Sequence, residues 1–239
     1  MRAVREIWRQ DGLLGLADRV WGRGFAWVAS RRLGYLLGRL RNLWRLPALR
    51  RRHAGGRLNL GCGPDRRAGF LNADLGLVGD IHMDVTRPFP LADGTFSLVF
   101  SEHLLEHLDE AGAANCLREC HRVLQPGGVL RLSTPDLARV VAGYLDPDGE
   151  GLAWRRATAV VSPWKYGPGA VAAPAQALND AFYLWDHRHL YDQAELTRVL
   201  REAGFDRITV YAPGEGSGEL TTGLEGRKDE SLVVEAVRE

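Results

Sequence analysis

A short glycine-containing run, LNLGCGP at residues 58–64, carries residue types suited to binding a small ligand. Its apolar start predicts a buried strand, and Gly61 and Gly63 predict a tight turn at the end of that strand. Glycine lets the backbone approach a ligand without a Cβ in the way. Residues 70–75, FLNADL, predict a second strand that ends near Asp74 and Leu75. An acid at the tip of the neighbouring strand is where ribose hydroxyls are usually held, so the pattern predicts a nucleoside site.

The spacing disfavours a nicotinamide dinucleotide as the ligand. The dinucleotide fingerprint needs a third glycine three residues after the second, and Arg66 occupies that position. It also places the acid about 20 residues further on, whereas Asp74 comes sooner. No Gly-Lys-Ser/Thr sequence of a phosphate-binding loop follows the turn. A nicotinamide-dependent enzyme is therefore the weaker alternative.

The run from Arg57 to Leu137 resembles the class I S-adenosylmethionine (SAM)-dependent methyltransferases, in particular small bacterial members with an Asn-Leu-Gly-Cys-Gly loop. The matching pieces, in order, are LNLGCGP, FLNADL, HMDVTRPFPLADGTFSLVFSEHLLEHL and RECHRVLQPGGVLRLSTPDL. The resemblance implies a Rossmann-like α/β fold with a seven-stranded, mostly parallel sheet whose last strand is antiparallel. It also implies an enzyme that transfers a methyl group from SAM to an acceptor and leaves S-adenosylhomocysteine (SAH).

The resemblance further implies which residues contact the cofactor. The glycine turn would admit the methionine end, Asp74 would hold the ribose, and Asp84 with the backbone of Val85 would hold the adenine. The loop that starts at Ser101 would flank the methionine portion. The implied cofactor-binding residues are Asn59, Gly61, Cys62, Gly63, Asp74, Leu75, Asp84, Val85, Ser101, Glu102 and His103. We expect residues 101–108 to form a helix. The alternatives to the cofactor contacts are a turn-capping role for Asp84 and a helix-capping role for Ser101.

Four residues are candidates for acting on the acceptor. By resemblance His107 lies near the transfer site. His187 and His189, in the run DHRHLYD at residues 186–192, are candidate general bases because neutral imidazole can take a hydroxyl proton near pH 7. Asp136 follows a predicted strand, and ligands of open α/β sheets bind beyond the carboxyl ends of strands. The alternatives are histidines bonded to backbone and an N-capping role for Asp136.

We expect no metal centre, because the chain shows no obvious carboxylate cluster. Cys116 and Cys120 lie one helical turn apart beside His121, but a fourth ligand at metal spacing is missing. Buried structural thiols are therefore the expectation for both cysteines. Three cysteines cannot build a disulfide framework, which favours the reducing cytoplasm.

The N-terminal 56 residues differ in charge from the rest of the chain. Of the 239 residues, 45% are hydrophobic and 26% charged, which is ordinary for a globular protein, and the net charge is +1. Residues 1–57 nevertheless hold 14 arginines against three acidic residues. Apolar residues recur there at helical spacing, so we expect basic amphipathic helices in this extension. No window of about 18 uncharged apolar residues exists, so a transmembrane span is not expected.

Two roles for the N-terminal extension remain open. Residues 1–52 can lie on an anionic membrane with tryptophan and leucine inward. Alternatively, the helices cover an edge of the sheet, because the connections between the first three predicted strands are too short for crossover helices. Specific nucleic-acid binding is not expected, since no recognition module is present.

The remaining elements follow from periodicity and turn chemistry. Residues 57–239 form the expected methyltransferase domain, and residues 137–189 form an aromatic-rich insertion that we expect to cap the acceptor pocket. The Gly-rich stretch 212–228 is expected to be a mobile loop. Expected strands cover residues 58–60, 70–75, 80–85, 96–100, 129–133, 205–211 and 231–237, and expected helices cover 111–124 and 193–203.

The acceptor is expected to be a small molecule or a saccharide, methylated on a hydroxyl group. The chemistry would be an in-line displacement at a methyl that the sulfonium already activates. The alternative from a different functional class is a non-catalytic SAM-binding protein, or a membrane-associated scaffold partner.

Overall fold

The computed structural model describes residues 36–43, 56–76, 78–146, 148–149, 151–167, 169–227 and 231–239. Its centre is a seven-stranded sheet in the order β3-β2-β1-β4-β5-β7-β6. Every neighbouring pair is parallel except the two pairs that involve β7. The expected sheet with an antiparallel last strand is therefore confirmed. The strands are β1 Gly56–Leu60, β2 Phe70–Asp74, β3 Ile81–His82, β4 Phe96–Glu102, β5 Leu124–Pro135, β6 Arg207–Tyr211 and β7 Ser231–Val237.

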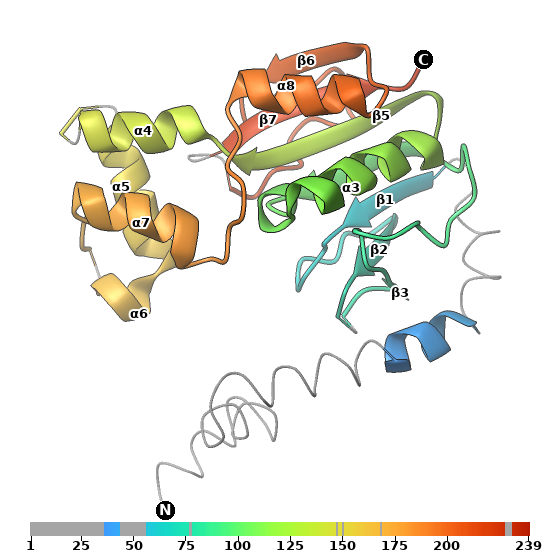
Figure 1. Cartoon of the computed structure of the whole chain (residues 1–239), viewed down its shortest axis with the longest axis horizontal. Helices are drawn as coiled ribbons and strands as arrows, with labels where there is room; N and C mark the ends of the chain where they lie inside the picture. Colours follow the sequence, from blue (N-terminus) through green and yellow to red (C-terminus); the bar gives the residue numbers. More distant parts are fainter. Residues whose placement is uncertain are drawn as a thin grey trace, which may run out of the picture.

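One face of the sheet is packed against helices α3 (Glu110–Val123) and α8 (Gln193–Glu202), which lie in front of it in Figure 1. Alternate strand residues such as Leu58, Leu130 and Leu132 are buried against this layer. The stripe of α3 that faces them includes Cys116 and Cys120, both buried and free, as expected for structural thiols. Asp192 caps α8 by accepting a hydrogen bond from the Glu195 amide.

The segment after β4 differs from the prediction of a helix over residues 101–108. β4 continues to Glu102, because Ser101 and Glu102 stay paired with β5. A single 3-10 turn, η1 (Leu105–His107), follows in place of a helix. Ser101 is therefore a strand residue and not a helix cap. β3 is also shorter than expected and covers only Ile81–His82.

Residues within the predicted cap form four helices beyond the carboxyl end of β5 (Figure 1). These are α4 (Leu137–Leu145), α5 (Gly151–Val161), α6 (Pro163–Tyr166) and α7 (Pro174–Tyr183). They share a small core in which Trp154 packs with Val140, Ala177 and Leu190. Part of the aromatic content that suggested a pocket wall thus stabilises the cap itself.

The other face of the sheet holds a fully buried arginine. Arg131 of β5 donates from Nε to Glu225 (2.6 Å) and from Nη1 to Glu235 (2.9 Å). Glu225 also accepts from the Gly214 amide at 3.0 Å, and Glu235 accepts from the Ser217 amide at 3.2 Å. These bonds tie the Gly-rich segment to the sheet. Residues 212–227, expected to be a mobile loop, are thus attached to the sheet by buried hydrogen bonds.

We predict that Arg131→Met lowers the free energy of unfolding by about 3–5 kcal/mol, because it leaves two buried carboxylates without their cation. Amide hydrogen exchange over residues 212–227 should accelerate at the same time. The matched control is Arg198→Met, which removes an exposed arginine paired with Glu195 and Glu202 on α8 and should change stability little. Equal effects of the two substitutions in denaturant titrations would contradict this account.

Residues 36–43 form a helix that docks on the open edge of the sheet. Asn42 donates from its amide nitrogen to the His82 carbonyl (2.6 Å) and accepts from the His82 amide (3.0 Å). Its side chain thereby replaces the backbone of a further strand. Gly38, one turn earlier, lets the helix approach, since a Cβ there would lie 2.3 Å from His82 Cγ. This part of the extension covers the sheet edge, as one of the two alternatives predicted.

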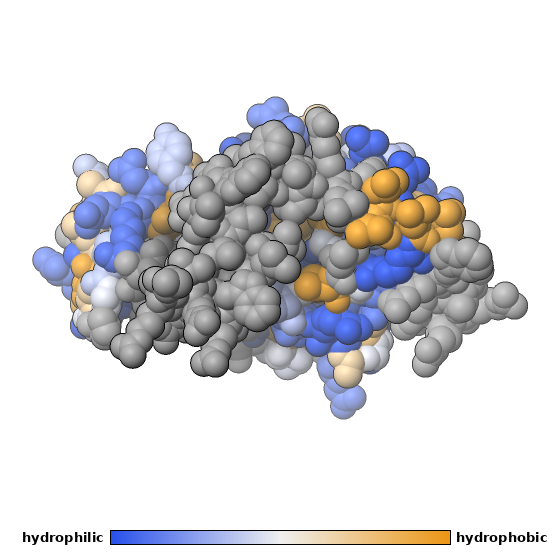
Figure 2. Space-filling view, turned by 90° about the horizontal axis from the view of Figure 1, so that it is seen from below, coloured by the Kyte–Doolittle hydropathy of each residue, from blue (hydrophilic) through white to orange (hydrophobic). Residues whose placement is uncertain are grey.

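The docking face of this helix is not its apolar face. Leu36, Leu37, Leu40 and Leu43 remain between 46% and 71% exposed. Figure 2, which views the molecule from the side of this helix, shows apolar surface beside strongly hydrophilic residues. The rest of the predicted helical extension, residues 1–35 and 44–55, lies outside the described residues. Among the described residues, no helix has the length and apolar character needed to cross a bilayer.

We predict that Asn42→Ala lowers the free energy of unfolding by about 1–3 kcal/mol, because it removes both hydrogen bonds between this side chain and the buried backbone of His82. The control is Leu40→Ala on the exposed face of the same helix, which removes no hydrogen bond. Thermal unfolding of both variants gives the comparison. A loss for Leu40→Ala that equals the loss for Asn42→Ala would contradict the docking described here.

Candidate functional site

The glycine turn after β1 leaves open space in front of its second glycine. Gly61 and Gly63 have φ values of +63° and +48°, a region that other L-residues rarely adopt. A Cβ at Gly61 would lie 2.9 Å from the Leu104 side chain, whereas a Cβ at Gly63 would meet no atom within 4 Å. Gly61 is thus needed for packing, and Gly63 presents bare backbone at the carboxyl edge of the sheet.

Asp74 at the tip of β2 fixes the same turn from the neighbouring strand. Its Oδ2 accepts the Gly63 amide at 3.0 Å and its Oδ1 accepts the Gly76 amide at 2.6 Å. Leu75 beside it is 42% exposed. Cys62, which lies between the two glycines of the turn, is buried. Burial together with the Asp74 charge raises the pKa of its thiol to about 11. The thiol is therefore neutral, and the carboxylate is the polar group presented at this edge.

Two buried asparagines stabilise the glycine turn and the loop that follows it. Asn59 of β1 and Asn72 of β2 are register partners, and Asn59 Nδ2 donates to Asn72 Oδ1 at 3.0 Å. Asn72 also accepts the Arg67 amide and donates to the Arg67 carbonyl, at 2.8 and 3.1 Å. Asn59 is therefore a positioning residue in this structure. Sequence reasoning missed the role of Asn72. An asparagine inside each of two neighbouring buried strands could have indicated that the two side chains bind each other.

Asp84 and Val85 follow β3 at the edge of the sheet. Asp84 accepts hydrogen bonds from the Thr86 amide (3.1 Å) and hydroxyl (2.6 Å), and its other oxygen lies 3.2 Å from Arg87 Nε. Val85 is buried. The turn-capping geometry that was the alternative for Asp84 is thus present.

The residues at the end of β4 have different environments. The Ser101 hydroxyl is buried and has no hydrogen-bond partner within the described part of the chain. Glu102 Oε1 accepts the Gly226 and Arg227 amides at 2.8 and 2.9 Å. Glu102 therefore anchors the segment before β7, and Ser101 supplies an unsatisfied polar atom.

Glu106 is fully buried and connects several elements. Its Oε1 lies 3.1 Å from His103 Nδ1, and its Oε2 accepts the Thr134 hydroxyl at 3.2 Å. The backbone carbonyl of Glu106 accepts the amides of Arg188 and His189, at 2.7 and 3.2 Å. Burial raises the pKa of this carboxyl, but the adjacent His103 imidazole outweighs burial and holds the pKa below its usual range. Glu106 is thus a buried carboxylate that links β4, β5 and the return from the cap.

His107 and His187 meet beside this carboxylate. Their rings are 4.8 Å apart in an edge-to-face arrangement. His187 Nδ1 lies 2.5 Å from the Ala181 carbonyl, and His107 Nδ1 lies 3.4 Å from the Asp186 carbonyl. A carbonyl partner requires the proton on Nδ1, so each neutral ring carries its lone pair on Nε2. Burial lowers the pKa of His187, which favours the neutral ring.

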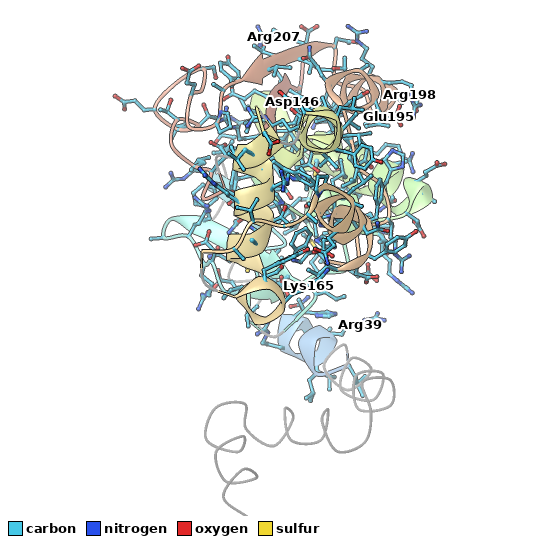
Figure 3. The ribbon with its side chains drawn as sticks, turned by 90° about the vertical axis from the view of Figure 1, so that its left-hand side faces the viewer. Arg39, Asp146, Lys165, Glu195, Arg198 and Arg207 are labelled. Carbon is cyan, nitrogen blue, oxygen red and sulfur yellow. The ribbon has the colours of Figure 1, made fainter. Side chains whose placement is uncertain are left out.

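The other two acceptor-side candidates lie apart from this pair. His189 Nε2 is 3.6 Å from Glu195 of α8, and Glu195 in turn pairs with Arg198 (Figure 3). Asp136 caps α4 through a 2.9 Å hydrogen bond from the Ala138 amide, as the alternative for this residue predicted. The structure thus brings His107 and His187 together but places His189 on the α8 side.

Backbone strain also concentrates around Glu106, His107 and His187. Within the described residues, the non-glycine residues with positive φ are His103 (+49°) and Asp186 (+59°). His103 contacts Glu106, and Asp186 precedes His187 and accepts from His107. Strained backbone of this kind persists where surrounding contacts enforce it, and it clusters at functional sites.

Comparison with known proteins agrees with this arrangement. A family model described as "Methyltransferase domain" matches residues 62–132, from the glycine turn through β4 and α3 into β5. A comparison with curated proteins finds no match.

Solved structures give broad but weak likenesses. A SAM-dependent methyltransferase of Thermotoga maritima, described as a possible histamine N-methyltransferase, is 17% identical with a TM-score of 0.47, over 89% of this chain and 97% of that one. A SAM-dependent methyltransferase of Mesorhizobium loti is 21% identical with a TM-score of 0.43, over 80% of this chain and 96% of that one. These likenesses do not bear on the acceptor.

The residues at the carboxyl edge fit SAM as the cofactor. Gly63 offers bare backbone with open space, Asp74 offers a carboxylate, and the buried Ser101 hydroxyl has no hydrogen-bond partner among the described residues. Residues 62–132 match a methyltransferase domain, and together with the strand order and the glycine turn they support an enzyme whose cofactor is SAM.

Proposed function

We propose that the protein transfers the methyl group of SAM to a hydroxyl of a small-molecule or glycan acceptor, and that His187 takes up the hydroxyl proton. The observation that carries the proposal is the 2.5 Å contact between His187 Nδ1 and the Ala181 carbonyl. This contact orients the ring and leaves Nε2 as the proton acceptor, beside His107 and the buried Glu106 carboxylate.

The proposed cofactor contacts follow the carboxyl edge of the sheet. The bare backbone at Gly63 would take the methionine portion, together with Ser101 and its neighbours. Asp74 would accept hydrogen bonds from the ribose hydroxyls in addition to the amides it already binds. Asp84 and Val85 would border the adenine. SAM supplies a methyl group that its sulfonium activates, so the protein chiefly has to bind and orient.

The chain's own residues would then perform three tasks. The cap and the glycine turn would hold the acceptor oxygen about 3 Å from the methyl carbon, in line with the bond that breaks. His187 would accept the hydroxyl proton on Nε2. The buried Glu106 carboxylate would stabilise the imidazolium that forms, since a nearby negative charge favours protonated histidine.

The location proposed for the enzyme is the cytoplasm, with peripheral contact to an anionic membrane through residues 1–52. Three free cysteines suit a reducing compartment. The exposed leucines of helix 36–43 beside arginines suit an interfacial helix. A membrane surface would place the enzyme near a lipid-linked glycan acceptor, whereas a freely diffusing metabolite would not need this contact.

We predict that His187→Gln lowers the rate of methyl transfer by about 100-fold or more, which is the usual contribution of a general base. Binding of SAH should remain close to the native value, because the substitution leaves the glycine turn unchanged. His189→Gln should retain most of the transfer rate, since His189 faces Glu195. The measurement is SAH release with a panel of hydroxylated acceptors.

The opposite pattern would overturn the assignment of the base. Loss of transfer in His189→Gln with retention in His187→Gln would make His189 the proton acceptor. Retention of transfer in both variants would mean that the acceptor needs no histidine base, as for an acceptor that is already deprotonated.

A further inference from the structure

We infer that Glu106, His107 and His187 form a binding site for a divalent transition-metal cation such as Zn²⁺, and that the bound cation inhibits methyl transfer. One ligand atom from each of the three side chains lies within 4.8 Å of the other two. Two imidazoles and a carboxylate are a ligand set that suits zinc and related cations. The binding part rests on this geometry alone, and the inhibition rests on the proposed function.

The two histidines are oriented as metal ligands usually are. Each ring faces a backbone carbonyl with Nδ1, His187 that of Ala181 and His107 that of Asp186. A carbonyl on one ring nitrogen fixes the tautomer and presents the lone pair of the other nitrogen to a metal. The carbonyls belong to α7 and the turn after it, so the cap supplies the outer contacts of the site.

The third ligand is a buried carboxylate that has lone pairs available for a cation. Glu106 is fully buried, and its Oε1 makes no well-aligned hydrogen bond within the described residues, although His103 Nδ1 lies 3.1 Å away. A carboxylate offers about four lone-pair sites. His103 and Thr134 hold the group in place, and a cation would satisfy the remaining sites. A buried carboxylate gains more from such a cation than an exposed one does.

The side chains have to move slightly to bind the cation. Zinc binds nitrogen at about 2.0–2.1 Å, so neighbouring ligand atoms of a tetrahedral centre lie about 3.3 Å apart. Small rotations of the two half-buried imidazoles would have to close the remaining gap. Three protein ligands leave a fourth position for water, the arrangement of an open rather than a closed zinc site.

Metal binding would compete directly with proton uptake. The cation would take the Nε2 lone pair that the proposed function assigns to the acceptor proton. The metal-loaded enzyme should therefore transfer methyl groups more slowly. Its affinity for SAH should not change, because the glycine turn and Asp74 contribute no ligand to the cation.

The test is a titration of the full chain, stripped of metal by a chelator, with Zn²⁺ and separately with Co²⁺. We expect one cation per chain, with a Co²⁺ absorption band typical of nitrogen and oxygen ligands. His187→Gln and His107→Gln should each weaken binding about 10-fold or more, the loss expected when metal-site residues are removed. The control is His121→Gln on α3, where the ring packs against Phe205. SAH binding by every variant reports that it is folded.

Binding that is absent, or equally strong in the native chain and in His187→Gln and His107→Gln, would overturn the site. Binding lost from these two variants but kept in His121→Gln would establish it. Zinc that binds without slowing transfer would overturn the inhibition. A metal-free native chain that binds zinc but transfers no methyl group to any hydroxylated acceptor would contradict the proposed function while leaving the metal site in place.

Discussion

The buried carboxylate of Glu106 is the constraint on which the arrangement of His107 and His187 depends. A charge without solvent is costly unless hydrogen bonds and opposite charge compensate for it. Here His103 and Thr134 provide that compensation, and each comes from the carboxyl end of a different strand. His103 is itself tied to Ser231 at the start of β7. The backbone of the same residue receives the chain as it returns from the cap. One group therefore fixes how three strands and the cap meet, and it thereby brings His107 and His187 together.

Polar side chains also replace missing helices elsewhere in this small domain. A doubly wound sheet is normally covered by crossover helices on both faces. The connections around β2 and β3 are too short for such helices, and Asn42 of helix 36–43 covers the resulting edge by pairing with the backbone of β3. On the second face, Arg131 draws the Gly-rich segment onto the sheet through Glu225 and Glu235. In both places, a few hydrogen bonds and ion pairs hold a segment against the sheet, in place of the buried apolar surface of a packed helix. Single substitutions at these positions are therefore expected to have large effects on stability.

Much of the fold was predictable from local patterns. The apolar strands, the glycine turn and the amphipathic spacing of α3 and α8 each indicate their element without knowledge of distant residues. Five of the seven strands fall close to their predicted ranges, whereas β3 is shorter and β5 begins at Leu124, five residues earlier than predicted. The helix predicted after β4 is wrong because pairing with β5 extends the strand through Glu102, a long-range effect that spacing does not reveal. Spacing likewise does not reveal that the Gly-rich segment is attached to the sheet, since Glu225 meets Arg131 only in the folded chain.

The candidate site was predictable in its residue types and less so in their geometry. Asp74, Gly61 and Gly63 lie at the carboxyl edge, where strand-tip acids and glycines are expected. No spacing rule links His107 to His187 across 80 residues, because the two rings meet only in the folded chain. The most direct test of the account is a crystal structure of the full chain with SAH. We predict that the SAH sulfur faces His107 and His187 across a space for one acceptor, with the ribose on Asp74. SAH bound elsewhere, or with its sulfur turned away from these histidines, would contradict it.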